Sequence, residues 1–287
     1  MSSDPRTNLR YAVVATRHAG GTRQARTSLR MRGVEGLAHL ASSLSAEVSG
    51  TLDAEVEQLH AAGVTAVLLG GSDYPPTLAS LPACPPVLFV LGESQHLQDL
   101  AVGICGSRHA TEQGLRAARA CGDAASEIGL TIVSGNARGV DMAAQTSALT
   151  AGGATTAVLA EGIRHFQPTE ALRAAGWDTG RAAAVSQFAP TRRWSVGAAM
   201  TRNGVIIGLS QALIVVEAGA TGGTISAGKQ ALRVGRPVFA LQFAGGTPTG
   251  NAELIDMGAV AIRSRADLAE HLRALHPATL ATTPTLM

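Results

Sequence analysis

Short continuous runs of apolar residues alternate with stretches of helical periodicity over most of this chain. Such a pattern predicts strands separated by helices. The runs that fit buried strands are 101–105, 130–133, 155–159, 182–186, 212–217 and 237–241. The stretches that fit helices are 111–128, 140–151, 170–175, 196–209 and 224–234. Continuous apolar strands that alternate with helices are typical of a parallel sheet covered on both faces, so the sequence predicts an α/β fold with a doubly wound, mostly parallel sheet.

The first third of the chain has a different pattern of apolar residues, without regular alternation of strands and helices. Apolar residues between Val34 and Ala62 recur at helical spacing, which predicts two short helices, and proline-containing turns separate two expected strands at 65–69 and 87–91. Arg, Thr, Ser and Gly dominate the first residues, so we expect little order there. The expected divisions are a poorly ordered segment at 1–32, a small N-terminal helical lobe and lead-in at 33–93, the main domain at 94–264, and a C-terminal helix with a frayed tail at 265–287.

The composition agrees with a folded protein and limits the kinds of ligand. Hydrophobic residues make up 46% of the chain and charged residues 15%, which is enough to bury a substantial core. The formal net charge of +2 is not typical of a nucleic-acid-binding protein, so any such role must rest on locally grouped arginines. Lysine occurs only as Lys229; the preference for arginine suits phosphate binding and is also what a GC-rich genome produces.

Cysteine, histidine and hydropathy exclude further classes of site. Cys84, Cys105 and Cys121 form neither a zinc pattern nor a disulfide framework, so we expect buried reduced thiols. The eight histidines show no metal-ligand spacing, and we predict no metal site and no cofactor. With no apolar stretch of about 18 residues and no charged-then-apolar leader, we expect a soluble, cytoplasmic protein without a membrane partner.

Four loops at the carboxyl ends of expected strands, or beside them, combine glycine or hydroxyl residues with a cation. Glycines let backbone N–H groups face a ligand, helix N-termini attract anions, and arginine adds charge-assisted hydrogen bonds. Such an edge suits phosphate, although it carries neither a G-x-G-x-x-G fingerprint nor a P-loop. The candidate DNA- or phosphate-binding residues are Gly106, Ser107, Arg108, Ser134, Gly135, Arg138, Gly139, Asp141, Arg202, Asn203, Gly222, Gly223, Thr224 and Lys229.

Three of these features have an alternative, structural interpretation. Asp141 could orient Arg138 or accept a ribose hydroxyl, or it could simply place a negative charge at a helix N-terminus. Glu217 could hold a pocket arginine, or it could cap the next helix. The segment Arg192-Arg193-Trp194 could supply two phosphate contacts and a stacking surface, or it could be a solvated loop with a partly packed tryptophan.

Taken in order, these loops resemble the DprA/Smf family of bacterial DNA-processing proteins. The similarity runs from Leu37 to Ala261, and the order of its pieces is more specific than any single piece. The pieces are Asp73-Tyr-Pro-Pro-Thr-Leu78, Pro85-Pro-Val-Leu-Phe89, Gly106-Ser-Arg108, Ser134-Gly-x-Ala-x-Gly-Val-Asp141, Arg202-Asn203 with Ile206-Ile-Gly-Leu-Ser210, Val215-Val-Glu-Ala218 with Gly223, Gly235-Arg-Pro-Val-Phe239, and Gly250-Asn251 with Leu254-Ile255 and Gly258-Ala259.

The resemblance implies a fold and a function. The fold is an extended Rossmann-like one. The function is non-catalytic binding of single-stranded DNA in a basic pocket, with dimerisation through the carboxyl-terminal half and loading of the RecA recombinase during natural transformation and recombination. The chain resembles a divergent, shortened member: Gln145, Gln187 and Gly204 replace the family's usual His, Glu and Arg, and we expect no winged-helix domain after residue 262.

Two other functions fit the same edge of the sheet. The LOG-type phosphoribohydrolases share the general fold, but their signature needs a glutamate three residues after a loop threonine, and Ala227 stands there after Thr224. Since no paired acids or nucleophile–base arrangement is evident elsewhere, we predict that the protein is not an enzyme. A nucleotide-sensing module would use the same pocket, and would need no arginine beyond the rim of the pocket.

Overall fold

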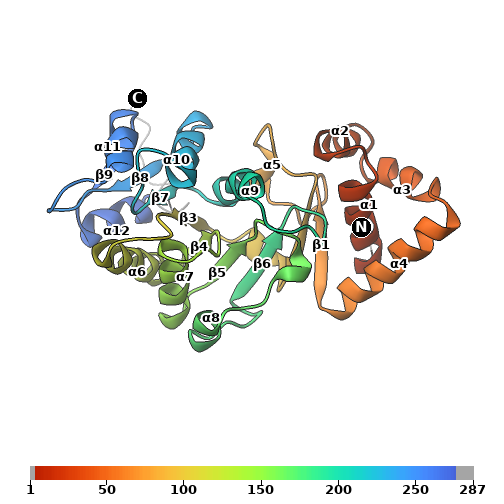
Figure 1. The fold of residues 1–287 in the computed structure, drawn as a ribbon, viewed down its shortest axis with the longest axis horizontal. Helices are drawn as coiled ribbons and strands as arrows, with labels where there is room; N and C mark the ends of the chain where they lie inside the picture. The colour runs from red at the N-terminus through yellow and green to blue at the C-terminus, as the bar shows by residue number, and fades with distance from the viewer. Residues whose placement is uncertain (1–3, 276–287) are drawn as a thin grey trace, which may run out of the picture. The chain divides into compact units, whose positions relative to one another are not determined.

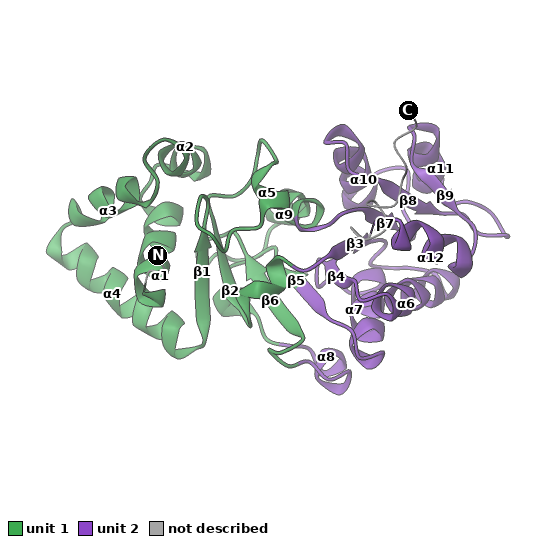
Figure 2. Cartoon of the chain, turned by 180° about the vertical axis from the view of Figure 1, so that it is seen from behind, with its two compact units in different colours: residues 1–98, 157–167, 178–208 green, residues 99–156, 168–177, 209–287 purple. Residues whose placement is uncertain are grey.

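The chain folds into two compact units in the computed structural model, which describes residues 4–275 (Figure 1). Within the described residues, unit 1 consists of residues 4–98, 157–167 and 178–208, and unit 2 of residues 99–156, 168–177 and 209–275 (Figure 2). The frayed tail that the sequence predicts after the C-terminal helix lies outside the described residues. Among the helices of residues 4–275, none combines the length and the apolar character that a membrane span needs.

Nine strands of the described residues make up the sheet, and most of their pairings are parallel. They are β1 Val64–Leu68, β2 Val87–Leu91, β3 Ala101–Cys105, β4 Thr131–Ser134, β5 Thr155–Val158, β6 Ala182–Ser186, β7 Leu213–Val215, β8 Val238–Leu241 and β9 Val260–Ile262. Their order is β1-β2-β6-β5-β4-β3-β7-β8-β9. The pairs β3–β4, β3–β7, β7–β8 and β8–β9 are parallel, whereas β1–β2 and β2–β6 are antiparallel. The prediction of a doubly wound, mostly parallel sheet is therefore confirmed.

The helices of unit 1 lie mainly before its first strand. They are α1 Pro5–Arg17, α2 Thr22–Arg32, α3 Val34–Ser42, α4 Ala46–Ala61, α5 Pro76–Ala79 and α9 Val196–Leu209, with short 3₁₀ turns η1 Ser94–Leu97 and η2 Ile163–His165. Proline at the first position of α5 and the serine cap of α4, where the Ser45 hydroxyl accepts from the Val48 N–H, explain where these two helices begin.

The first 32 residues differ from the sequence-based expectation of poor order, because they form α1 and α2. Leu9, Ala12 and Val13 follow the helical spacing and are fully buried, so α1 contributes to a core. The arginines of α1 lie next to Leu9 and Val13 on the helix surface and pair with acidic residues of α4. Arg6 lies 2.8 Å from Glu57, and Arg17 lies 2.7 Å from Glu55.

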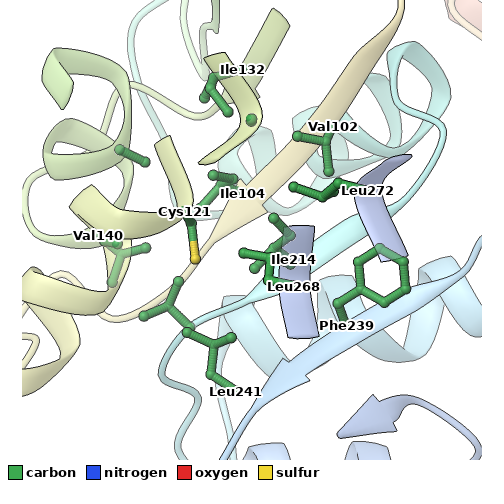
Figure 3. Close-up of a cluster of buried hydrophobic side chains, with 14 of the residues drawn as sticks. Val102, Ile104, Cys121, Ile132, Val140, Ile214, Phe239, Leu241, Leu268 and Leu272 are labelled. Carbon is green, nitrogen blue, oxygen red and sulfur yellow. The ribbon is translucent and has the colours of Figure 1, made fainter. Parts of the chain in front are cut away.

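Unit 2 has its own apolar core between the parallel strands and the helices that cover them. The helices are α6 Glu112–Glu127, α7 Val140–Thr150, α8 Glu170–Ala174, α10 Gly223–Arg233, α11 Thr249–Asp256 and α12 Arg265–Arg273. Figure 3 shows the branched side chains of the central strands, Ile104, Ile132 and Ile214, among side chains of α6, α7 and α12. Because α6 and α7 carry many small residues, they pack closely, and the loops that precede them are held near each other.

Within this core, Cys121 is buried on α6, and burial raises the pKa of its thiol to about 12. We expect the thiol to resist alkylation in the folded protein at pH 8 and to react when urea unfolds it, as peptide mass spectrometry would show. The unfolded thiol has a pKa of about 8.5, so the unfolded chain loses this proton first as the pH rises. The free energy of unfolding should therefore fall between about pH 9 and 12. Rapid labelling of Cys121 in the folded protein would contradict its burial.

Candidate functional site

The strand order changes direction at β3, which has β4 on one side and β7 on the other. In doubly wound sheets, ligands bind outside the carboxyl ends of the strands at such a reversal. The loops that follow β3, β4 and β7 meet there, all within unit 2. The Val140 N–H, at the start of α7, donates to the Ser107 carbonyl at 3.2 Å. The Thr224 hydroxyl, at the start of α10, donates to the Gly106 carbonyl at 3.0 Å.

Two of the predicted glycines are required by this close approach of loops. A Cβ atom on Gly106 would lie 2.5 Å from a methyl group of Val140. Gly139 has φ +81°, and a Cβ atom there would lie 2.3 Å from the Ser107 carbonyl oxygen. Any larger residue would push the β3 and β4 loops apart, so these glycines fix the shape of the edge.

Asp141 and Ser134 are buried and shape the loop after β4. The Asp141 carboxylate accepts hydrogen bonds from the N–H groups of Gly135, at 3.1 Å, and Ala137, at 3.4 Å. The Ser134 hydroxyl donates to the Ile104 carbonyl of β3 at 2.7 Å. Through these bonds the carboxylate, which lies in the first turn of α7, orders the backbone that precedes this helix.

Glu217 caps a helix, but a different one from the helix that follows it in the chain. The N–H and the hydroxyl of Thr111 both donate to its carboxylate at 3.1 Å. Thr111 is itself the N-cap of α6, where its hydroxyl accepts from the Gly114 N–H. Glu217 therefore places a negative charge at the N-terminus of α6, where the helix dipole stabilises it.

Beside these loops lies an open pocket of about 410 Å³, at the N-terminal ends of α6 and α7. Its charged lining consists of Arg108, Arg119 and Arg138, and His109 lies with them; among the described residues, no acidic one lines it. Within residues 4–275, the guanidinium groups of Arg119 and Arg138 make no ion pair. Three guanidinium groups with no carboxylate among them favour an anionic ligand, and the fork of each group matches two oxygens of one phosphate.

The other predicted residues have different places. Gly222 and Gly223 lie at the start of α10, before Thr224, and are exposed. Lys229 lies further along α10 and pairs with Glu253 of α11 at 2.5 Å, so its charge is already matched by a carboxylate. Arg202 and Asn203 belong to α9 in unit 1 and are buried, with 6% and 8% of their surface exposed. The structure thus brings together the residues of the first two loops and Thr224.

Sequence reasoning missed Arg119 and His109. His109 follows Arg108 directly, and the Gly-Ser-Arg motif ends one residue too early to include it. Arg119 lies in the middle of a helix, four residues after Leu115, which also lines the pocket. Helical spacing places Leu115 and Arg119 on one face of α6. Only the packing of α6 on α7 shows that this face borders the pocket.

Comparison with known proteins gives one consistent family. The family model described as DNA recombination-mediator protein A matches residues 65–273. A curated relative, protein Smf from Synechocystis sp., is 35% identical over 173 residues, which are 59% of this chain and 44% of that protein. The chain spans about half the length of the curated relatives of this name, from Synechocystis and Escherichia coli.

Two solved structures are similar to this one along most of their length. The X-ray structure of DNA processing protein A (DprA) from Streptococcus pneumoniae matches with a TM-score of 0.73 and 25% identity, over 91% of this chain and 97% of that one. A structure of DNA processing protein A from Helicobacter pylori matches with a TM-score of 0.63 and 24% identity, over 73% of this chain and 95% of that one.

Proposed function

Because the chain belongs to the DNA recombination-mediator protein A family, also called DprA, we propose that it binds single-stranded DNA at the carboxyl edge of its parallel strands. The observation that carries this proposal is the pocket that Arg108, Arg119 and Arg138 line, with no acidic residue among its described lining. The H. pylori relative's structure is described as showing a single-stranded DNA binding mode. In this chain, the phosphates would bind the three guanidinium groups.

The net charge makes this pocket the expected source of affinity. With a formal charge of only +2, the chain as a whole attracts DNA weakly, so binding depends on local arginines. Each phosphate that a guanidinium neutralises releases condensed counterions, and the affinity then falls with salt concentration. The backbone that carries Arg108 and Arg138 is fixed by the close contacts of Gly106, Ser107 and Gly139.

We extend the proposal to the consequence of binding. The family is named for mediating DNA recombination, and the protein would do so as a homodimer that transfers the strand to a RecA-type recombinase without breaking a bond in the DNA. The loop sequence supports a non-catalytic role, because Thr224 is followed by Ile225, Ser226 and Ala227 and the glutamate of the related hydrolases is missing. The residues of the site that we assign to DNA are Arg108, Arg119 and Arg138, with Ser107 and the start of α10 beside them.

We expect Arg119→Ala and Arg138→Ala each to weaken binding of a labelled oligothymidine about tenfold at low salt, because each removes a charge-assisted hydrogen bond to phosphate. Fluorescence anisotropy between about 50 and 200 mM salt should also show a shallower dependence on salt, by about 0.7 in the logarithmic slope for each phosphate that is no longer neutralised. Arg116→Ala is the matched control, since Arg116 is exposed on the same helix and does not line the pocket.

An equal reduction of affinity in the control and the pocket variants would contradict a specific site, and unchanged affinity in both pocket variants would remove the pocket from the proposal. A nucleoside monophosphate competitor separates the remaining alternative. Complete displacement of the oligomer by the mononucleotide would mean that the pocket serves a small nucleotide instead. Arg202 is unsuitable for this test, because it is buried and its removal would also change folding.

A further inference from the structure

The loop between β6 and α9 in unit 1 displays two arginines and a tryptophan in succession. Arg192 and Arg193 are exposed, and Trp194 keeps 47% of its surface exposed. The chain has only two tryptophans, and aromatic residues make up 3% of it. A half-exposed indole beside two guanidinium groups is therefore a distinctive feature of this protein's surface, outside the pocket described above.

The backbone of this loop is held firmly against the segment around η2. The Gly162 N–H donates to the Arg192 carbonyl at 2.8 Å, and the Arg164 N–H donates to the Pro190 carbonyl at 3.1 Å. Gly162 leaves room for this contact, because a Cβ atom there would lie 2.2 Å from the Pro190 carbonyl oxygen. The loop thus presents its side chains from a fixed backbone.

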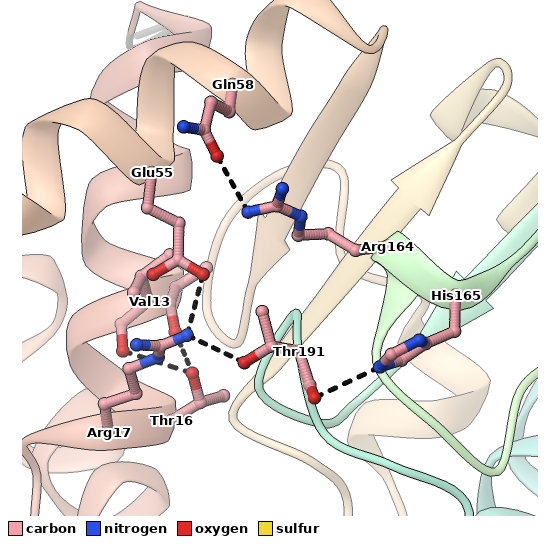
Figure 4. Close-up of polar contacts among 9 residues, drawn as sticks. Val13, Thr16, Arg17, Glu55, Gln58, Arg164, His165 and Thr191 are labelled. Carbon is pink, nitrogen blue, oxygen red and sulfur yellow. Dashed lines mark hydrogen bonds and ion pairs between the residues drawn. The ribbon is translucent and has the colours of Figure 1, made fainter.

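The N-terminal helices and η2 make further side-chain contacts with this loop, shown in Figure 4. Arg17 of α1 donates to the Thr191 hydroxyl at 3.1 Å and, with the same nitrogen, to Glu55 of α4 at 2.7 Å. His165 of η2 lies 3.1 Å from the Thr191 carbonyl through its Nε2. Side chains of α1 and η2 therefore both hold the loop at Thr191.

The exposed groups of the loop have complementary chemistry. The Arg192 guanidinium lies over the Phe188 ring, with its central carbon 4.9 Å from the ring centroid. A guanidinium stacked in this way keeps N–H donors in its plane for an anion. Next to Trp194, the first turns of α9 expose Val196 and Met200, which are one turn apart on the same face.

We propose that this loop is a second contact for single-stranded DNA, in which a base stacks on Trp194 and adjoining phosphates bind Arg192 and Arg193. The inference rests on the proposed function and deepens it. Cations next to an exposed aromatic surface match the alternation of phosphates and bases along a single strand, and such stacking tolerates any base. Trp194 and the two arginines would then add affinity for an oligonucleotide that a mononucleotide in the pocket does not gain.

Tryptophan fluorescence tests this contact directly. In the Trp177→Phe variant, Trp194 is the single tryptophan, and we expect oligothymidine to quench its emission in parallel with binding measured by anisotropy. We also expect Trp194→Ala to bind the oligomer about five- to tenfold more weakly, at the lower end of what loss of one stacked base causes. Trp194→Phe, which keeps an aromatic ring, should recover most of that affinity.

The outcomes separate the two proposals. If wild-type protein binds the oligomer, but Trp194 is not quenched and Trp194→Ala binds as tightly as wild type, the loop is not a contact and the pocket proposal still stands. If anisotropy detects no oligomer binding to wild-type protein, the proposed function fails, and the second contact fails with it. Quenching by a mononucleotide as strong as that by the oligomer would also overturn the inference.

Discussion

Replacing Asn251 with alanine is expected to lower the free energy of unfolding by about 4 kcal/mol, because the change leaves several buried backbone groups without partners. Asn251 is fully buried at the start of α11. Its side-chain oxygen accepts from the Ala218 N–H at 2.9 Å, and its amide nitrogen donates to the carbonyls of Val215, Val216 and Leu241 at 2.8–3.2 Å.

These four hydrogen bonds connect α11 to the carboxyl ends of β7 and β8. The neighbouring Gly250 adds to this connection, since its N–H donates to the Ala218 carbonyl and a Cβ atom there would lie 2.3 Å from the Gly219 carbonyl oxygen. Alanine at position 251 would remove both the donor and the acceptor and leave a small cavity. Because water cannot reach these groups, the cost per unpaired group is about 1–3 kcal/mol.

Urea and thermal denaturation measure this effect, and a decrease of about 4 kcal/mol should lower the melting temperature by roughly 10 °C. Gln113→Ala is a suitable control, because Gln113 is exposed in the first turn of α6 and its removal should change stability by less than about 0.5 kcal/mol. A destabilisation below about 1 kcal/mol in Asn251→Ala would mean that the backbone groups find other partners in the folded state.

Gly139→Ala is expected to have the second large effect, on both stability and DNA binding. The positive φ of +81° strains any residue with a Cβ atom, and that atom would lie 2.3 Å from the Ser107 carbonyl oxygen and 2.9 Å from the Arg108 carbonyl carbon. Both neighbours are backbone atoms, so the β3 loop itself must move. We expect a decrease of about 3 kcal/mol in the free energy of unfolding and a tenfold or larger decrease in oligothymidine affinity, because Arg108 moves with the loop.

Gly152→Ala separates the strain from the collision. Gly152 follows α7 with φ +83°, but a Cβ atom there would meet no atom within 4 Å. It should therefore cost only the conformational penalty, about 1 kcal/mol, and leave DNA binding unchanged. Denaturation and anisotropy of the two variants side by side provide the measurement. Equal losses of stability and unchanged DNA affinity in both variants would show that the β3 loop moves to accommodate the additional Cβ atom at little cost.

The α/β core could be predicted because it is encoded locally. The runs at 101–105 and 182–186 and the periodicity at 196–209 coincide with β3, β6 and α9, since continuous apolar runs and helical spacing both follow from burial. The first 32 residues were mispredicted for a related reason. Their many arginines resemble a solvated tail, while the apolar residues that α1 buries are Leu9 and one short run, Ala12 to Ala15.

The order of residues along the chain was therefore enough to predict the family, the succession of strands and helices, and the glycine- and arginine-containing loops at the carboxyl edge of the sheet. What the side chains in those loops do became clear only from the folded molecule. Asp141 and Glu217 are paired with backbone and hydroxyl groups, Lys229 is paired with Glu253, and Arg119 joins the pocket from the middle of a helix. Each of these contacts forms because segments far apart in the sequence pack together and bring two groups within about 3 Å of each other. The spacing of residues along the chain does not determine such distances.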